Sequence, residues 1–153
     1  MIELIERFYG AFNRKDGDAM AACYAPDVRF SDPAFGELRG EAAGDMWRML
    51  TSTPGDLRVD LEEHDAEGDR GSAHWIAHYT FSKTGRPVVN DIHATFRFRD
   101  GLIAEHDDVF SFWKWSRQAL GPAGLVLGWT PLLQAKVRKQ ALASLEEFRA
   151  GHN

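Results

Sequence analysis

Apolar residues recur at helical spacing in the first part of the chain. A first helix is predicted from Ile2 onwards, with an apolar side formed by Ile5, Phe8, Tyr9 and Phe12. A break at Asp16-Gly17-Asp18 separates it from a second short helix, which runs through Met20, Cys23 and Tyr24. The N-terminal region is therefore predicted to be a pair of helices.

A short strand and a third helix follow this pair. The strand runs from Val28 to Asp32 and leads into a turn between Gly36 and Gly40. The apolar side of the third helix is formed by Ala43, Met46, Trp47 and Leu50. The segment Thr53-Pro54-Gly55 is predicted to end this helix, because proline cannot continue one.

From Leu57 onwards the apolar period changes to two, which is typical of strands with one buried face. The alternating positions are Leu57, Val59 and Leu61, then Trp75, Ala77, Tyr79 and Phe81, then Ile92, Ala94, Phe96 and Phe98. A last strand is predicted from Leu102 to about Trp113. Tight-turn sequences at Gly68, Gly85 and Gly101 predict that consecutive strands pair antiparallel. The fold class is therefore α+β.

The C-terminal part departs from this alternation. Two breaks, at 121–124 and 128–131, bracket an irregular apolar stretch, and a final amphipathic helix follows. The apolar positions of that helix are Leu133, Val137, Leu145 and Phe148. We expect one domain over residues 1–153, with a core at about 2–113 and a C-terminal extension at about 114–150.

Composition and charge narrow the class of protein. The 153 residues are 44% hydrophobic, which suffices for one core, and the net charge of −5 with scattered Lys and Arg argues against nucleic-acid binding. The single cysteine, Cys23, forms no internal disulfide, and no leader or membrane-length apolar run is present. We expect a cytoplasmic protein without a membrane segment.

Asp32 is the first candidate for chemistry. Side chains alternate along a strand, so Val28, Phe30 and Asp32 share one face. If that face is the interior, the carboxyl is in an apolar environment, where its burial is costly unless it has a function. The alternative is that Asp32, which precedes Pro33, only caps a turn by accepting backbone hydrogen bonds.

Two more candidates lie on the last strand. Alternate residues of a strand share a face, so His106 and Asp108 lie on the same inner face as Phe110. By the same alternation Asn90 shares the inner face with Ala94. We take Asp32, His106 and Asp108 as the candidate acid–base set, in which two carboxylates sharing a low-dielectric space titrate as a coupled pair. The alternatives are that His106 is a satisfied core histidine, and that a bulge turns Asp108 to solvent.

Metal and cofactor sites are not expected. His74 and His78 are four residues apart on one strand, hence about 13 Å apart and too far to bind one ion. They face away from Trp75, as does His93; if this convex face of the sheet pairs with another copy of the chain in a homodimer, His74, His78, His93 and Thr95 are polar residues of the interface. No phosphate-binding loop or dinucleotide fingerprint occurs, and no organic cofactor is expected.

The order of elements, together with several motifs, resembles the nuclear transport factor two-like superfamily, in particular its SnoaL-like and ketosteroid isomerase-like branches. The resemblance covers residues 2–113. It rests on segments 7–13, 24–33, 36–40, 96–101 and 105–108, including Phe30-Ser31-Asp32-Pro33 and Glu105-His106-Asp107-Asp108. It implies a cone-shaped curved sheet, antiparallel or mixed, packed against the N-terminal helices. The apolar interior of the cone is expected to bind a small molecule, and many members are dimers.

The resemblance also implies roles for individual residues. Asp32 matches the general base of the isomerases, and Asp108 matches an acid that commonly faces the cavity in SnoaL-like proteins. The two oxyanion donors of the isomerases are replaced by Phe8, which precedes Tyr9, and by Ala94. Since one such donor is worth about 3 kcal/mol in the transition state, steroid isomerisation is not expected.

Two functions therefore remain open. One is a cofactor-independent acid–base enzyme of isomerase, cyclase or hydrolase type, acting on an apolar oxygenated metabolite. The other is a non-catalytic ligand-binding or dimerising accessory domain. The expected substrate-binding residues are Tyr9, Trp47, Trp75, Tyr79, Asn90, Ile92, Phe96 and Phe110. The C-terminal extension is expected to cover the mouth of the cone as a lid, to contact a partner, or to pack on the outer sheet.

Overall fold

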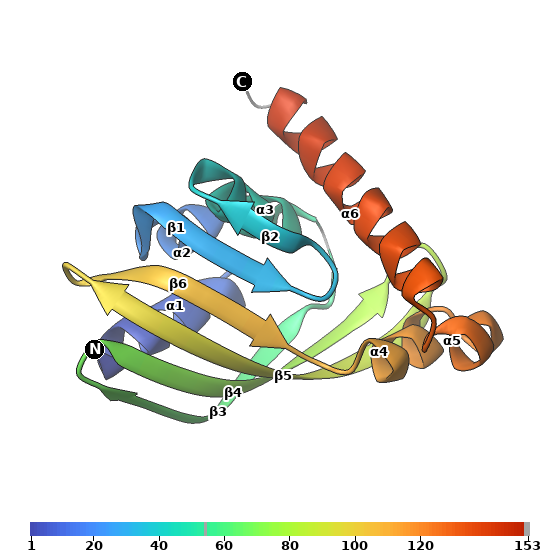
Figure 1. The fold of residues 1–153 in the computed structure, drawn as a ribbon, viewed down its shortest axis with the longest axis horizontal. Helices are drawn as coiled ribbons and strands as arrows, with labels where there is room; N and C mark the ends of the chain where they lie inside the picture. The colour runs from blue at the N-terminus through green and yellow to red at the C-terminus, as the bar shows by residue number, and fades with distance from the viewer. Residues whose placement is uncertain (54, 152–153) are drawn as a thin grey trace.

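One curved sheet, open at its edges rather than closed into a barrel, carries the fold (Figure 1). The computed structural model describes residues 1–53 and 55–151. Within these ranges six strands pair in the order β2-β1-β6-β5-β4-β3. The strands are β1 (Tyr24–Asp32), β2 (Gly36–Arg39), β3 (Arg58–Glu67), β4 (Arg70–Phe81), β5 (Arg86–Arg99) and β6 (Leu102–Val109). The helices are α1 (Ile2–Asn13), α2 (Gly17–Ala22), α3 (Glu41–Ser52), α4 (Phe112–Ala119), α5 (Pro122–Leu127) and α6 (Pro131–Gly151).

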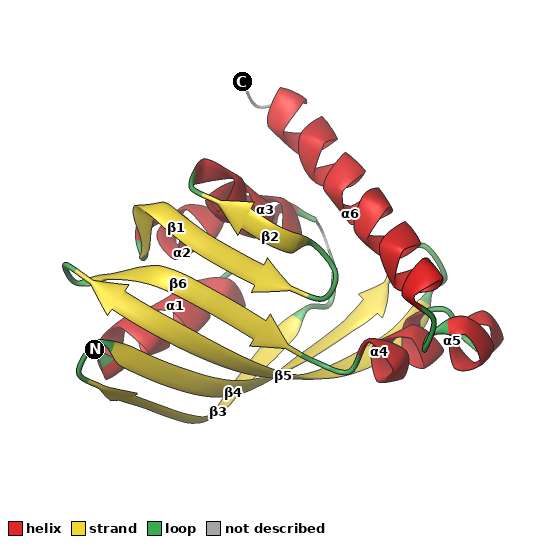
Figure 2. Cartoon of the chain, in the orientation of Figure 1, coloured by secondary structure: helices red, strands yellow, loops and turns green. Residues whose placement is uncertain are grey.

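The N-terminal helices fill the concave side of the sheet (Figure 2). The apolar side predicted for α1 is buried, and Ile5 and Phe8 have no exposed surface. Asn13 at the end of α1 bonds both backbone groups of Val59 in β3, donating from Nδ2 at 2.7 Å and accepting at Oδ1 at 2.9 Å. The expected α+β cone with helices against its sheet is therefore confirmed.

Two boundaries near β1 differ from the prediction. Tyr24 begins β1 instead of ending α2, because it pairs in parallel with Ile103 of β6. The segment expected to be only a turn after Asp32 contains β2, which pairs antiparallel with β1 through Phe30 and Leu38. In both cases pairing with a distant or neighbouring strand overrides the local pattern. Of the predicted stop after α3, Pro54 lies outside the described residues.

Strands β3 to β6 form the predicted antiparallel meander. Along β5 every second residue from Val88 to Phe98 is buried, and the residues between them are exposed. A register shift between β5 and β6 falls near Ala104, where Ile103 and Ala104 are both buried. This irregularity precedes His106, so it leaves the alternation of the residues that follow unchanged.

The chain leaves the sheet earlier than expected. Strand β6 ends at Val109, and α4 begins at Phe112 after Ser111, whose side chain accepts a hydrogen bond from the backbone of Lys114. The alternating aromatic residues of this segment had suggested a strand continuing to Trp113. A serine cap starts a helix there instead. The buried residues of α4 form a second apolar cluster with Val88, namely Phe112, Trp115 and Ala119.

Helix α6 lies beside α3 and the turn between β1 and β2. Gln134 Nε2 and Arg138 donate to the carbonyl oxygen of Pro33 at 3.2 and 3.4 Å, and Arg149 pairs with Asp45 at 2.9 Å. Leu145 is the one residue of α6 that is buried within the described chain. None of the described helices has the length and apolar character needed to cross a bilayer.

Candidate functional site

A chain of hydrogen bonds crosses the inner face of the sheet. Tyr24 Oη lies 2.7 Å from His106 Nδ1, and His106 Nε2 lies 2.9 Å from Asp108 Oδ1. Indole groups bond to both ends: Trp47 Nε1 donates to Tyr24 at 2.7 Å, and Trp75 Nε1 donates to Asp108 Oδ1 at 3.4 Å. Helix α3 and strands β1, β6 and β4 together hold this network.

His106 is enclosed on all sides and has no exposed surface. Its ring lies 4.5 Å from that of Phe96, 5.1 Å from that of Phe30 and 5.5 Å from that of Phe8, measured between centroids. Both ring nitrogens have partners. The polar contacts of His106 are therefore with Tyr24 and Asp108, and the ring has no direct contact with solvent.

The order of donors along the network assigns the protons. The Tyr24 hydroxyl accepts from Trp47, so its own proton is available for His106 Nδ1. Because a carboxylate oxygen only accepts, His106 Nε2 is the donor of the bond to Asp108 Oδ1. Burial holds the pKa of the Tyr24 hydroxyl well above its usual range, so this proton stays in place at neutral pH. The arrangement presents Asp108 as an acceptor with one oxygen engaged.

Asp32 ends β1 and is half-buried. Its Oδ1 accepts from the backbone of Ala34 at 2.9 Å and of Phe35 at 2.6 Å, so it does cap the turn. Burial raises the pKa of the carboxyl from 3.8 to about 7. The amide hydrogen bonds oppose the rise, and the nearby Asp108 carboxylate adds to it. Capping uses one carboxylate oxygen and leaves Oδ2 without a partner in the described chain.

Tyr79 of β4 lies close enough to Asp32 to be affected by its charge. Its hydroxyl accepts from Trp115 Nε1 of α4 at 2.7 Å. Burial raises the pKa of Tyr79, and the charge of Asp32 adds to this rise. Because the hydroxyl oxygen is already an acceptor, its proton remains available to a bound molecule. Helix α4 thereby sets the position of a residue on the inner face.

Several polar groups on this face have no partner within the described chain. The Tyr9 hydroxyl is buried without a hydrogen bond, and the burial raises its pKa well above the usual range. The side chain of Asn90 is also unpaired although the residue is only 7% exposed, and Asp108 Oδ2 accepts nothing. Most buried polar groups in proteins have partners, so unpaired groups gathered on one face indicate a place for a polar ligand.

The remaining expected pocket residues lie on the inner face of the sheet, except Trp47, which belongs to α3. Trp47, Trp75, Ile92 and Phe96 are buried, and Phe110 is half-buried just after β6. Asp32, Tyr79 and Phe110 keep some exposure, whereas the residues around His106 have almost none. The first three therefore mark the end of the interior that is nearest to solvent.

Two residues of the network were missed by the sequence analysis. Tyr24 had been assigned to a helix, and the alternation of Val28 and Phe30 does not reach it, because Pro26 is exposed and the register with β6 shifts between Tyr24 and Arg29. Trp115 had no signal, because its role depends on α4 folding back toward Tyr79. The distance along the chain between Tyr24 and His106 also hides their contact from any local pattern.

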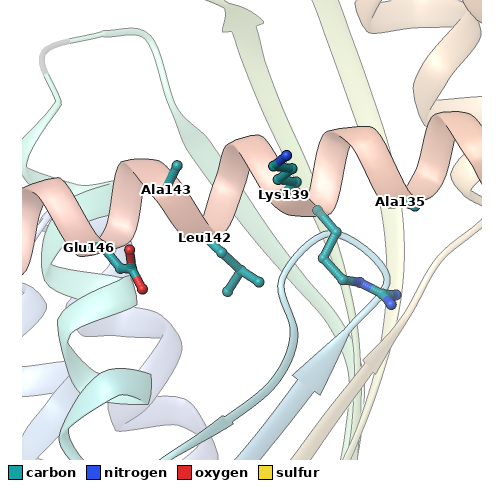
Figure 3. Close-up of a pocket in the computed structure, with 6 residues that line it drawn as sticks. Ala135, Lys139, Leu142, Ala143 and Glu146 are labelled. Carbon is teal, nitrogen blue, oxygen red and sulfur yellow. The ribbon is translucent and has the colours of Figure 1, made fainter.

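A surface groove follows α6 and lies apart from these residues. Figure 3 shows it, and its lining consists of Ala135, Arg138, Lys139, Leu142, Ala143 and Glu146. A second hollow lies among Arg14, Gly17, Arg48 and neighbouring residues. Neither the groove nor the hollow contains Asp32 or Asp108. The interior of the fold around these two aspartates is filled largely by aromatic side chains.

Comparison with known proteins identifies the family. The sequence profile of the SnoaL-like domain matches residues 5–106, which is more than half of the chain. The chain belongs to the SnoaL-like family. None of the curated proteins compared with this SnoaL-like chain matches it.

Solved structures agree with this family. The SnoaL-like chain is similar to a putative polyketide cyclase from Xanthomonas campestris pv. campestris, with 27% identity, 76% of this chain and 94% of that chain covered, and a TM-score of 0.65. A hypothetical protein with a ketosteroid isomerase-like fold from Catenulispora acidiphila, in complex with trimethylamine, has 20% identity, 84% and 98% coverage and a TM-score of 0.69. An LEH-like epoxide hydrolase from M. tuberculosis has 20% identity, 82% and 94% coverage and a TM-score of 0.67. The last two likenesses support the fold alone.

Proposed function

We propose that this SnoaL-like protein is a cofactor-independent acid–base enzyme that acts on a small, largely apolar, oxygenated metabolite. The observation that carries the proposal is the unpaired Oδ2 of Asp32, since only Oδ1 accepts hydrogen bonds; burial and the nearby Asp108 carboxylate raise the pKa of this carboxyl to about 7. A carboxyl that is half-protonated near neutral pH both accepts and returns protons effectively. A capping residue alone does not need this property.

Asp32 is proposed as the proton acceptor. Its free Oδ2 removes a proton from a carbon next to a carbonyl, and the resulting enolate oxygen is stabilised by hydrogen-bond donors. Tyr79 and Asn90 are proposed as those donors, because the hydroxyl proton of one and the amide of the other are unpaired. The protonated Asp32 then returns its proton to the same or another carbon, which completes an isomerisation or follows a ring closure.

His106 and Asp108 are proposed as proton partner and orienter. His106 holds Asp108 through Oδ1, while Oδ2 stays free for the substrate or a water molecule. The negative charge of Asp108 helps to keep the proton on Asp32. The same pair of carboxyls also suits hydrolytic opening of an epoxide, in which one activates water and the other protonates the oxygen.

The names of similar structures are consistent with this range of chemistry. The Xanthomonas protein is described as a putative polyketide cyclase and the M. tuberculosis protein as an epoxide hydrolase. Steroid isomerisation is not proposed, because Phe8 and Ala94 are buried and offer no donor at the two matching positions. Tyr9, next to Phe8, supplies an unpaired hydroxyl in the interior instead and is proposed to contact the substrate.

Hydrogen–deuterium exchange of a ketone panel in D2O tests the proposal without knowledge of the natural substrate. Wild type is expected to catalyse exchange next to the carbonyl of at least one ligand that raises its melting temperature. Asp32→Asn should abolish the exchange and keep the thermal shift, since asparagine preserves shape and turn-capping ability. Asp107→Asn is the matched control, because Asp107 faces outward and pairs with Arg29. Exchange by Asp32→Asn at the wild-type rate would remove Asp32 from the mechanism.

A non-catalytic ligand-binding protein is the second candidate. Full hydrogen bonding of His106 favours it, since a histidine with both nitrogens engaged needs no role beyond the core. In that case a ligand should stabilise wild type and Asp32→Asn equally, and no exchange or product should form with either.

Pairing of two copies through the outer face of the sheet is proposed as well. Val89 and Val109 are 51% and 63% exposed there, beside polar residues including His78 and Thr95. Multi-angle light scattering should give twice the chain mass, and Val109→Asp should halve it. A wild-type monomer at all concentrations measured would exclude this dimer.

A further inference from the structure

The outer face of the sheet carries a cluster of ionisable side chains that the proposed function does not use. His74 of β4 and Asp91 and His93 of β5 each offer a ligand atom within 4.8 Å of the other two. His74 Nε2 lies 2.5 Å from Asp91 Oδ1, and His93 Nε2 lies 3.6 Å from the same oxygen. The two imidazole rings stack with centroids 4.4 Å apart. Both histidines therefore direct a nitrogen toward one carboxylate.

Strand register creates this cluster. His74 and His93 are directly opposite each other in the antiparallel pair β4–β5, and Asp91 is two residues before His93 on the same face. Along β4 itself, His74 and His78 are too far apart to share an ion. The close neighbours come from the adjacent strand, and local spacing contains no information about them.

We propose that His74, Asp91 and His93 bind a divalent transition-metal ion such as Zn²⁺, Co²⁺ or Ni²⁺. Two imidazoles and a carboxylate are a donor set that these ions prefer. With bonds of about 2.0–2.2 Å, adjacent ligand atoms of a tetrahedral site lie about 3.3 Å apart. The two measured distances to Asp91 fall on either side of this value. Side-chain rotations that unstack the two imidazole rings and turn their nitrogens toward one point complete the site.

The exposure of the cluster permits these rotations. The side chains of His93 and Asp91 are 70% and 63% exposed and can reorient, whereas His74, on which His93 stacks, is 27% exposed and the more fixed of the three. The open side of the ion is then available to water, which supplies the remaining coordination positions. The site uses residues of one chain and predicts one ion per chain in the monomer. Val109 of the proposed dimer face lies opposite His93, so pairing of two copies through that face would cover the site.

The surroundings favour a cation. A bulge in β3 between Leu61 and His64 places Glu62 and Glu63 at the register position beside His74, and both are exposed. The other outer-face positions next to the cluster hold uncharged residues, namely Ser72, Ile76, Thr95 and Val109. No positive side chain occupies these adjoining positions, and the local charge is negative.

The same face provides a matched control. His78 Nε2 bonds to Asp60 at 2.9 Å, which resembles the His74–Asp91 pair. Asp60 also pairs with Arg58, and no second histidine lies beside it in the described chain. The His78–Asp60 pair therefore lacks a third ligand and has a cation in its place, and it should not bind the metal.

Titration of tag-free protein with ZnCl2 by calorimetry, and with CoCl2 by visible absorption, tests the site. Wild type should bind one ion per chain and develop the Co²⁺ bands of a low-coordinate nitrogen–oxygen site. His93→Ala and Asp91→Asn should each weaken binding by at least about tenfold and remove these bands. His78→Ala should change neither. All three substituted side chains are at the surface, so unchanged melting temperatures should show that the variants are folded.

Two results would overturn the inference. One is the absence of binding heat and of Co²⁺ bands in wild type. The other is binding that His93→Ala and Asp91→Asn leave unchanged, which would place the ion elsewhere. Neither result bears on Asp32, because the cluster and Asp32 lie on opposite faces of the sheet.

Discussion

The three tyrosines of the chain make different numbers of hydrogen bonds through their hydroxyl groups, and this difference predicts their contributions to stability. Tyr24 accepts from Trp47 and bonds His106, Tyr79 accepts from Trp115, and Tyr9 is buried with no partner among the described residues. Substitution by phenylalanine removes only the hydroxyl in each case. The series therefore isolates two, one and no hydrogen bonds.

The expected losses follow from the groups left unpaired. Tyr24→Phe leaves the Trp47 N–H and His106 Nδ1 without partners in the core, and an unpaired buried group costs about 1–3 kcal/mol. We expect a loss of about 2–4 kcal/mol in the free energy of unfolding. Tyr79→Phe leaves only the Trp115 N–H without an acceptor, at a half-buried site, and should lower the free energy of unfolding by about 1 kcal/mol. Tyr9→Phe removes a hydroxyl that is buried away from water and makes no hydrogen bond in return. The free energy of unfolding should therefore be unchanged or raised by up to about 1 kcal/mol.

Urea unfolding followed by circular dichroism measures these differences. The dependence of the unfolding free energy on urea concentration should stay constant across the series, because the surface exposed on unfolding is nearly the same. The order of stability should be Tyr9→Phe, then Tyr79→Phe, then Tyr24→Phe. A loss for Tyr9→Phe equal to that for Tyr24→Phe would refute the assigned network.

Two further predictions concern Asp32 and the packing of α4 against α5. The pKa of Asp32 is about 7 in the folded protein against 3.8 ordinarily, so the folded state binds more protons between these values and its stability should fall as pH rises from about 4 to 7. Asp32→Asn should remove this part of the slope and be more stable than wild type above pH 7 in urea unfolding; equal slopes would contradict the raised pKa. A Cβ at Gly124 would lie 1.9 Å from the carbonyl oxygen of Ser116, so Gly124→Ala should cost at least about 2 kcal/mol. Gly151→Ala, where nothing lies within 4 Å, should be neutral by the same measurement, and equal effects would show that α4 and α5 do not pack so closely.

The alternation of side chains predicted correctly which residues face the interior. Along β5 the positions from Asn90 to Phe98 follow a strict period of two, and the structure buries the expected set. His106 and Asp108 are likewise buried on β6. This success has a local cause, because the direction of a side chain depends on backbone geometry over a few residues.

Local patterns failed where pairing or folding back decided the conformation. The short strand β2 exists because it pairs with β1, and Tyr24 belongs to β1 because it pairs with β6. At the end of β6, alternating aromatic residues suggested more strand, but the Ser111 cap and packing against Val88 favour α4. In each case tertiary contacts outweigh a weak local preference.

The sequence by itself determined the α+β class and the family resemblance, and it predicted the inner position of the candidate acids with a capped turn and a bulge as open alternatives. Only the tertiary structure decided which side chains meet: Tyr24 with His106, Trp115 with Tyr79, and His74 with His93. The physical reason is the distance along the chain over which each property is decided. Burial follows from the period of the nearby sequence, whereas a hydrogen bond depends on strand register and on separations of about 3 Å between residues far apart in the chain.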